Sequence, residues 1–179
     1  KKITIGILGL GFLGSFVACQ LSKNGYNILA FKNSKPKKKY AFKVFYQRKN
    51  LKKFINTCDI IVNILPSTKD TKNIINNKFL NNMKKNALFI NVGRGSAVNE
   101  KDLFFHLKRN KQFYASLDVF NKEPLVKSNS LWNLNNVVIT PHVASLTVID
   151  DAVKHMYMKF LEFKKKGTVK NEVNINKGY

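Results

Sequence analysis

The sequence predicts an α/β protein built on a doubly wound parallel sheet in three layers, α/β/α. Three observations favour this fold. The chain has 179 residues, of which 44% are apolar, so it can bury the core of one domain and is short for two. Apolar runs of strand length alternate with helical patterns, which is typical of a parallel sheet. A Gly-x-Gly-x-x-Gly motif follows the first apolar run.

The glycine motif lies between an apolar run at residues 5–8 and a helical pattern at residues 12–24. In a Rossmann-type domain the first glycine permits a tight turn, the second lets a pyrophosphate approach the backbone, and the third lets helix and strand pack closely. The start of the helix then offers unpaired N–H groups to the phosphates. We therefore predict dinucleotide binding; the alternative is a glycine-rich turn in another kind of α/β protein. The expected contacts are Gly9, Gly11, Phe12, Leu13 and Gly14.

The first half of the chain continues the alternation. We predict a second strand at residues 26–31 and a short helix at residues 51–57, separated by a basic, irregular stretch at residues 32–50. Residues 59–65 form an apolar run that suits a third, buried strand. Pro66 is expected to end it, because proline cannot donate a hydrogen bond to a sheet.

The second half contains the remaining elements. We predict strands at residues 87–92, 113–119 and 137–140, and helices at residues 78–85, 100–110 and 146–166. The last helix is amphipathic, and Gly167 is expected to end it. This pattern gives one NAD(P)-binding Rossmann domain at residues 1–145, followed by a C-terminal helix and tail at residues 146–179.

The formal net charge of +22 is large for a chain of this size and raises the question of a nucleic-acid partner. However, the lysines are scattered among many asparagines and isoleucines. All three residue types have A/T-rich codons, so genome composition can produce this bias without a binding function. The sequence contains no nucleic-acid-binding motif, and we predict no nucleic-acid partner.

Membrane insertion and disulfide bonding are also not expected. No apolar run approaches the ~20 residues of a membrane span, and Cys19 and Cys58 are too few for a disulfide framework. We interpret both cysteines as small buried apolar residues. No cluster of metal ligands stands out, and we expect a cytoplasmic protein.

The end of the second strand indicates which dinucleotide binds. An NAD-binding domain places an acidic residue about 20 residues beyond the glycines, on the ribose 2′-OH. This chain has no Asp or Glu before Asp59, and the expected position carries Lys32, Asn33 and Ser34. Such a loop suits the 2′-phosphate of NADP, so we predict NADP, with NAD as the alternative. These lysines would otherwise be ordinary solvated side chains.

Three polar stretches follow predicted strands of the second half. They are Asn-Val-Gly-Arg-Gly at residues 91–95, Leu-Asp-Val-Phe with a nearby Glu-Pro at residues 117–124, and Thr-Pro-His-Val-Ala-Ser at residues 140–145. The carboxyl ends of parallel strands meet at one edge of the sheet, where open α/β sheets bind ligands. An arginine, a glutamate and a histidine are therefore expected to converge.

These motifs, together with the glycines, resemble the D-isomer-specific 2-hydroxyacid dehydrogenases. The spacing from Glu123 to His142, with Leu131-Trp132 between them, is most similar to the glyoxylate/hydroxypyruvate reductase A branch. The resemblance covers essentially the whole chain. It implies a homodimer and NADPH-dependent reduction of a small 2-keto acid to the 2-hydroxy acid. It also implies a second, substrate-binding domain beyond these residues, without which this piece of the chain is not expected to turn over substrate readily.

The resemblance also implies roles for single residues. Arg94 would bind the carboxylate and carbonyl of the keto acid. His142 would protonate the carbonyl oxygen as general acid, and Glu123 would orient the imidazole and favour its protonated form. Asp118 would hold the nicotinamide amide. The cofactor-binding residues implied for this half of the site are Leu65, Pro66, Thr71, Val92, Gly93, Arg94, Asp118, His142, Ala144 and Ser145.

Alternatives remain at this stage. Singly, the arginine, glutamate and histidine would each fit a structural role, as we infer for His106 and His155 within predicted helices. A phosphoglycerate or D-lactate dehydrogenase would share the same motifs, since substrate choice lies in the other domain. A nucleotide-sensing binding protein of the same fold could also retain the three residues.

Overall fold

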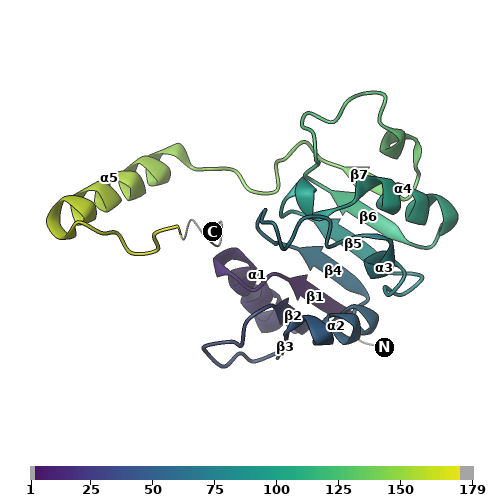
Figure 1. The fold of residues 1–179 in the computed structure, drawn as a ribbon, viewed down its shortest axis with the longest axis horizontal. Coiled ribbons are helices and arrows are strands. Elements are labelled where there is room, and N and C mark those ends of the chain that lie inside the picture. Colours follow the sequence, from purple (N-terminus) through teal and green to yellow (C-terminus); the bar gives the residue numbers. More distant parts are fainter. Residues whose placement is uncertain (1–2, 174–179) are drawn as a thin grey trace. The chain divides into compact units, whose positions relative to one another are not determined.

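One sheet of seven parallel strands organises residues 3–142 of the computed structural model, which describes residues 3–173 (Figure 1). The strand order is β3-β2-β1-β4-β5-β6-β7. The chain thus builds one half of the sheet outward from β1, returns, and builds the other half from β4. This reversal creates the switch point at which doubly wound sheets bind ligands, and it confirms the predicted α/β, Rossmann-type fold.

The bounds of the elements follow the sequence pattern closely. The strands are β1 (Thr4–Leu8), β2 (Asn27–Lys32), β3 (Lys43–Tyr46), β4 (Ile60–Asn63), β5 (Leu88–Asn91), β6 (Tyr114–Leu117) and β7 (Val137–Ile139). The α-helices are α1 (Phe12–Lys23), α2 (Leu51–Thr57), α3 (Asn77–Leu80), α4 (Glu100–Arg109) and α5 (Ile149–Lys166). Three 3₁₀ turns are η1 (Arg48–Asn50), η2 (Gly95–Ala97) and η3 (Ser130–Asn133).

Helices cover both faces of the sheet, as the three-layer prediction requires. On one face, α2, α3 and α4 contribute Phe54, Phe79 and Leu103 to a core cluster with Phe89 of β5. On the other face, Ala18 of α1 packs in a smaller cluster with residues of β1 and β2. The parallel strands are therefore buried from two sides, which explains their near-continuous apolar runs.

Two predictions about local structure were wrong. Residues 32–50 contain the edge strand β3, which pairs with β2 from Leu29↔Lys43 to Lys32↔Tyr46. The predicted helix at residues 78–85 is the short α3, which ends at Leu80 because the chain turns at Asn81 and Asn82. Asparagine favours turns over helix interiors, since its side chain competes for backbone hydrogen bonds.

The cysteines differ from each other. Cys58 is fully buried against Phe54, and burial raises the pKa of its thiol to about 12. Cys19 on α1 is only half-buried, so the expectation of a buried residue was wrong there. Both cysteines are free thiols.

The chain divides into two compact units, residues 1–142 and 143–179. The predicted boundary at residue 145 stays a prediction. The second unit contains α5, which ends at Gly167 in a left-handed conformation with φ of 70°, as predicted. Helix α5 exposes Met156, Tyr157 and Phe160. No helix among residues 3–173 has the length and apolar character needed to cross a membrane. The predicted tail extends past residue 173, outside the described residues.

Candidate active site

The turn between β1 and α1 has the geometry that the glycine motif predicts. Gly9 has φ of 108°, in the region that favours glycine, and its N–H donates to the carbonyl of Phe31 in β2. Gly14 touches the turn, since a Cβ there would lie 1.9 Å from the carbonyl oxygen of Gly9. Around Gly11 there is open space, and the side chains of Phe12 and Leu13 are exposed. The turn thus leaves its backbone accessible to a ligand.

The loop after β2 lies beside the end of β3, a strand that was not predicted from the sequence. Lys32 pairs in register with Tyr46 of β3, and the N–H of Gln47 donates to the carbonyl of Asn33 at 3.1 Å. Arg48 follows directly as an exposed residue of η1. The edge strand therefore brings a guanidinium to the end of the sheet that carries Lys32, Asn33 and Ser34. The short apolar run from Val44 to Tyr46 was the available signal for this strand.

His142 and Glu123 form an ion pair between two strand ends. Nδ1 of His142 lies 2.8 Å from Oε2 of Glu123. The other oxygen of Glu123 accepts the backbone N–H of Phe120 at 2.8 Å, and the N–H of His142 donates to the carbonyl of Asp118 at 2.9 Å. His142 adopts φ of 57°, a left-handed conformation uncommon outside glycine. The loops after β6 and β7 thus fix the imidazole, and Nε2 is the ring nitrogen that Glu123 does not contact.

Electrostatics favour a charged Glu123. Hydrogen bonds from His142 and from the Phe120 N–H hold the pKa of the Glu123 carboxyl below its ordinary value. A carboxyl whose pKa is lower in the folded than in the unfolded chain stabilises the fold above its ordinary pKa. That contribution is lost as the pH falls through the lowered value. The Glu123 carboxylate is therefore charged at neutral pH and accepts a hydrogen bond from Nδ1 of His142.

Arg94 and Asp118 lie at neighbouring strand ends but make other contacts. Arg94 follows β5, is exposed, and donates from its guanidinium to the carbonyl of Gly93 at 2.7 Å. Asp118 is buried after β6 and accepts the hydroxyl hydrogen of Thr140. Within residues 3–173, Arg94 makes no hydrogen bond to His142 or Glu123. The structure brings the histidine and glutamate together and leaves the arginine on the adjacent loop.

The loop after β4 is stiffened by its threonines. The hydroxyl of Thr71 donates to the carbonyl of Pro66 at 2.6 Å and accepts the N–H of Thr68 at 2.9 Å. Leu65, which precedes Pro66, lies against the loop after β5. The backbones are so close that a Cβ on Gly93 would lie 2.9 Å from the carbonyl oxygen of Leu65. The predicted residues Val92 and Gly93 belong to that second loop.

Ala144 and Ser145 belong to the second unit. Their expected cofactor contacts remain predictions, as do the contacts assigned to the other site residues. No group of three or more His, Cys, Asp or Glu among the described residues could hold a metal ion.

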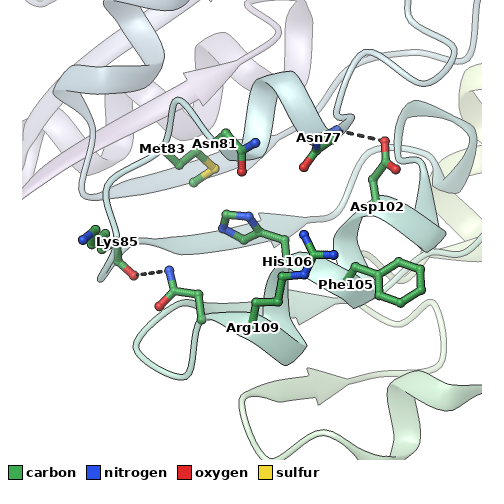
Figure 2. A pocket seen from close by; sticks show the side chains of 9 residues that line it. Asn77, Asn81, Met83, Lys85, Asp102, Phe105, His106 and Arg109 are labelled. Carbon is green, nitrogen blue, oxygen red and sulfur yellow. Dashed lines mark hydrogen bonds between the residues drawn. The ribbon is translucent and has the colours of Figure 1, made fainter.

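A separate crevice of about 630 Å³ lies between α3 and α4 (Figure 2). Lys85 and Asn110, in its lining, stand where β5 and β6 begin, so the crevice reaches the edge opposite to His142. Asp102 caps α3 by accepting the N–H of Asn77. The rings of His106 and Phe113 pack nearly perpendicular to each other, with 4.7 Å between their centroids. Burial lowers the pKa of the His106 imidazole. The crevice contains none of the predicted site residues.

Known proteins are similar to this chain in sequence and in fold. Residues 1–144 match the family model of the D-isomer specific 2-hydroxyacid dehydrogenase, NAD binding domain. The chain is 34% identical over 178 residues to glyoxylate/hydroxypyruvate reductase A of Citrobacter koseri, covering 99% of this chain and 57% of that protein. This chain therefore spans little more than half the length of that curated relative.

Two solved structures are similar. A D-isomer specific 2-hydroxyacid dehydrogenase from Xanthobacter autotrophicus Py2, in complex with NADPH, has a TM-score of 0.93 and 32% identity, over 99% of this chain and 73% of that one. The NADPH-dependent glyoxylate/hydroxypyruvate reductase of Sinorhizobium meliloti, in complex with NADP and sulfate, has a TM-score of 0.92 and 30% identity, over 99% and 57%.

Proposed function

This chain belongs to the D-isomer specific 2-hydroxyacid dehydrogenase family, as its NAD-binding domain, and from that premise we propose that the whole protein reduces a small 2-keto acid with NADPH. Glyoxylate and hydroxypyruvate are the proposed substrates. The observation that carries the proposal is the His142–Glu123 pair, held by hydrogen bonds at the sheet edge that also carries the glycine turn. We further propose that the protein is cytoplasmic.

The residues of the turn fit a dinucleotide. Gly11 presents open space where a side chain would otherwise stand, and α1 begins directly after it, so its first N–H groups can receive a pyrophosphate. No carboxylate stands at the end of β2, where NAD-specific domains carry one. When bound, the nicotinamide would supply a hydride to the keto carbon.

The proposed proton transfer starts at His142. Nδ1 is directed to the Glu123 carboxylate, so Nε2–H is the group that gives its proton to the keto oxygen. Glu123 would keep the imidazole ring oriented through Nδ1 during the transfer. Arg94 would leave its bond to the Gly93 carbonyl and bind the substrate carboxylate, because a guanidinium fork matches two planar oxygens.

A turnover assay tests the proposal. The full-length protein should oxidise NADPH when glyoxylate or hydroxypyruvate is added, which would be seen as a loss of absorbance at the nicotinamide band. A nucleotide-sensing protein of the same fold would bind NADPH without consuming it. D-lactate or phosphoglycerate dehydrogenase activity would appear as oxidation of those hydroxy acids instead.

The preference for NADPH over NADH is expected to depend on the carboxyl ends of β2 and β3. Replacing Lys32 with Asp and Arg48 with Ala should weaken NADPH binding about tenfold or more and leave NADH binding little changed or improved. Loss of charge-assisted hydrogen bonds to the 2′-phosphate is the physical reason. Calorimetric titration with both cofactors measures the effect, and Lys111→Ala, at the opposite edge of the sheet, is the control. Equal affinity of the parent for NADPH and NADH would contradict the assignment.

We also propose a homodimer. Tyr114 and Val138 expose 53% and 62% of their surface on neighbouring strands, on the sheet face that α3 and α4 leave open. Closed two-fold dimers are the commonest oligomers. The net charge of +22 opposes association, so light scattering should show a dimer that strengthens with salt. Val138→Lys should shift it toward monomer, whereas a parent that stays monomeric at all salt concentrations would contradict the proposal.

A further inference from the structure

Two buried carboxamides connect the strand ends β4 and β5. Asn63 and Asn91 are the last residues of these strands and are paired in register. Their exposed fractions are 0% and 1%, and Nδ2 of Asn63 donates to Oδ1 of Asn91 at 2.8 Å. Burying an amide is costly unless its polar atoms are hydrogen-bonded. The pairing therefore makes each asparagine dependent on the other.

Each asparagine also holds the loop that follows its own strand. Oδ1 of Asn63 accepts the N–H of Leu65 at 3.3 Å. Oδ1 of Asn91 accepts the N–H of Gly93 at 3.3 Å, and its Nδ2 donates to the carbonyl of Arg94 at 3.5 Å. One hydrogen-bonded unit thus links the loop that begins with Leu65 to the loop that carries Arg94.

The sheet itself does not require polar side chains at these positions. Ile61 and Phe89, two residues earlier in the same strands and on the same face, are apolar and fully buried. Two leucines could fill the same space, but they could not bond the backbone of the following loops. What the asparagines add is their hydrogen bonds to those two loops.

We propose that Asn63 and Asn91 are positioning residues for the reaction. They hold the Leu65–Pro66 loop and the Gly93–Arg94 loop in fixed relation, so that the cofactor and the carboxylate-binding guanidinium meet in the geometry that hydride transfer needs. This inference rests on the proposed function. Neither asparagine touches the reacting atoms; both act through the backbone of the loops.

The double variant Asn63→Leu/Asn91→Leu in the full-length protein separates positioning from stability. We expect a melting temperature lowered about as far as in the control below, because the N–H groups of Leu65 and Gly93 lose their acceptors. We also expect an NADP⁺ affinity at least tenfold weaker and a kcat for glyoxylate about 100-fold lower, because a displacement of about 1 Å can have that effect. Asn136→Leu is the matched control. It is also buried and donates to the carbonyls of Leu107, Asn110 and Phe113, at the edge where β6 and β7 begin. It should lower the melting temperature and leave NADP⁺ affinity and the KM for glyoxylate unchanged.

A second variant, Asn63→Asp, makes the NADP⁺ affinity depend on pH in a way that a merely structural role would not. Its carboxylate cannot donate to Oδ1 of Asn91, whereas the protonated carboxyl can. NADP⁺ affinity relative to the parent should therefore be weak at pH 8 and recover toward pH 5. The parent's own binding and turnover report on the proposed function. With an active parent, unchanged affinity and kcat in the double variant, or an Asn63→Asp affinity ratio that does not change with pH, overturn the positioning role alone.

Discussion

Replacing His142 with Ala in the full-length protein should lower the rate of glyoxylate reduction by about 10²- to 10⁴-fold, the usual worth of a positioned general acid. NADPH affinity should change little, because the imidazole ring is held by Glu123 and is not part of the glycine turn. Steady-state turnover and a separate NADPH titration measure the two effects. His155→Ala, an exposed histidine of α5, is the control. Near-parental turnover in His142→Ala would show that another group donates the proton.

The pH profile adds a second readout of the same pair. Glu123→Gln keeps a hydrogen-bond partner for Nδ1 and removes the carboxylate. The pKa of Glu123 is lowered in the fold, so the parent should lose rate only when the pH falls through that lowered value and protonates the carboxyl, and the variant should lack this step. The maximal rate should drop less than in His142→Ala. An identical pH dependence of the rate in variant and parent would mean that the charge of Glu123 is not needed and that only its hydrogen bond to His142 matters.

The second large effect concerns the glycine turn. Gly14→Ala would place a Cβ 1.9 Å from the backbone oxygen of Gly9, a contact that only a movement of the turn or of α1 can relieve. We expect a loss of roughly 3 kcal/mol or more in the free energy of unfolding, in the range of severe backbone and packing defects. NADPH binding should be lost as well, since the turn that would receive the pyrophosphate is displaced.

Gly11→Ala is the matched comparison for that variant. A Cβ there meets no atom within 4 Å and Gly11 has φ of −81°, which alanine adopts readily. The variant should melt like the parent yet bind NADPH at least tenfold more weakly, because the new methyl occupies the space of the approaching pyrophosphate. Thermal unfolding and calorimetric titration on both variants provide the measurement. Parental affinity in Gly11→Ala would show that the dinucleotide does not lie over this turn.

Much of the fold could be predicted because pattern and structure agree. The glycine turn, the alternation of apolar runs and the stop at Gly167 are local signals, and each was confirmed by the structure. Strand β3 was missed because it is a four-residue edge strand with one buried side chain, Phe45, directly after a lysine-rich loop. Charged side chains on an edge strand protect a sheet against pairing with other chains. The same charged side chains obscure the apolar pattern by which a strand is predicted from sequence.

The candidate site was predicted unevenly for a similar reason. Glu123 and His142 are 19 residues apart, and their contact depends on β6 and β7 being neighbours, which the motif order indicated. Arg48 could not be found without β3. The sequence did not single out Asn63 and Asn91 as a pair, because a hydrogen bond between strand ends depends on the register of β4 with β5 and leaves no local signal.

The short span of the His142–Glu123 pair, to which we assign proton donation, has an evolutionary consequence. The pair, the Phe120 N–H that orients Glu123 and the Asp118 carbonyl that fixes His142 all lie within residues 118–142. Duplication or recombination can therefore transmit this segment as one piece. If the proposed role holds, mutations elsewhere can change substrate choice while the proposed acid is inherited unchanged, so that the two properties can evolve at different rates.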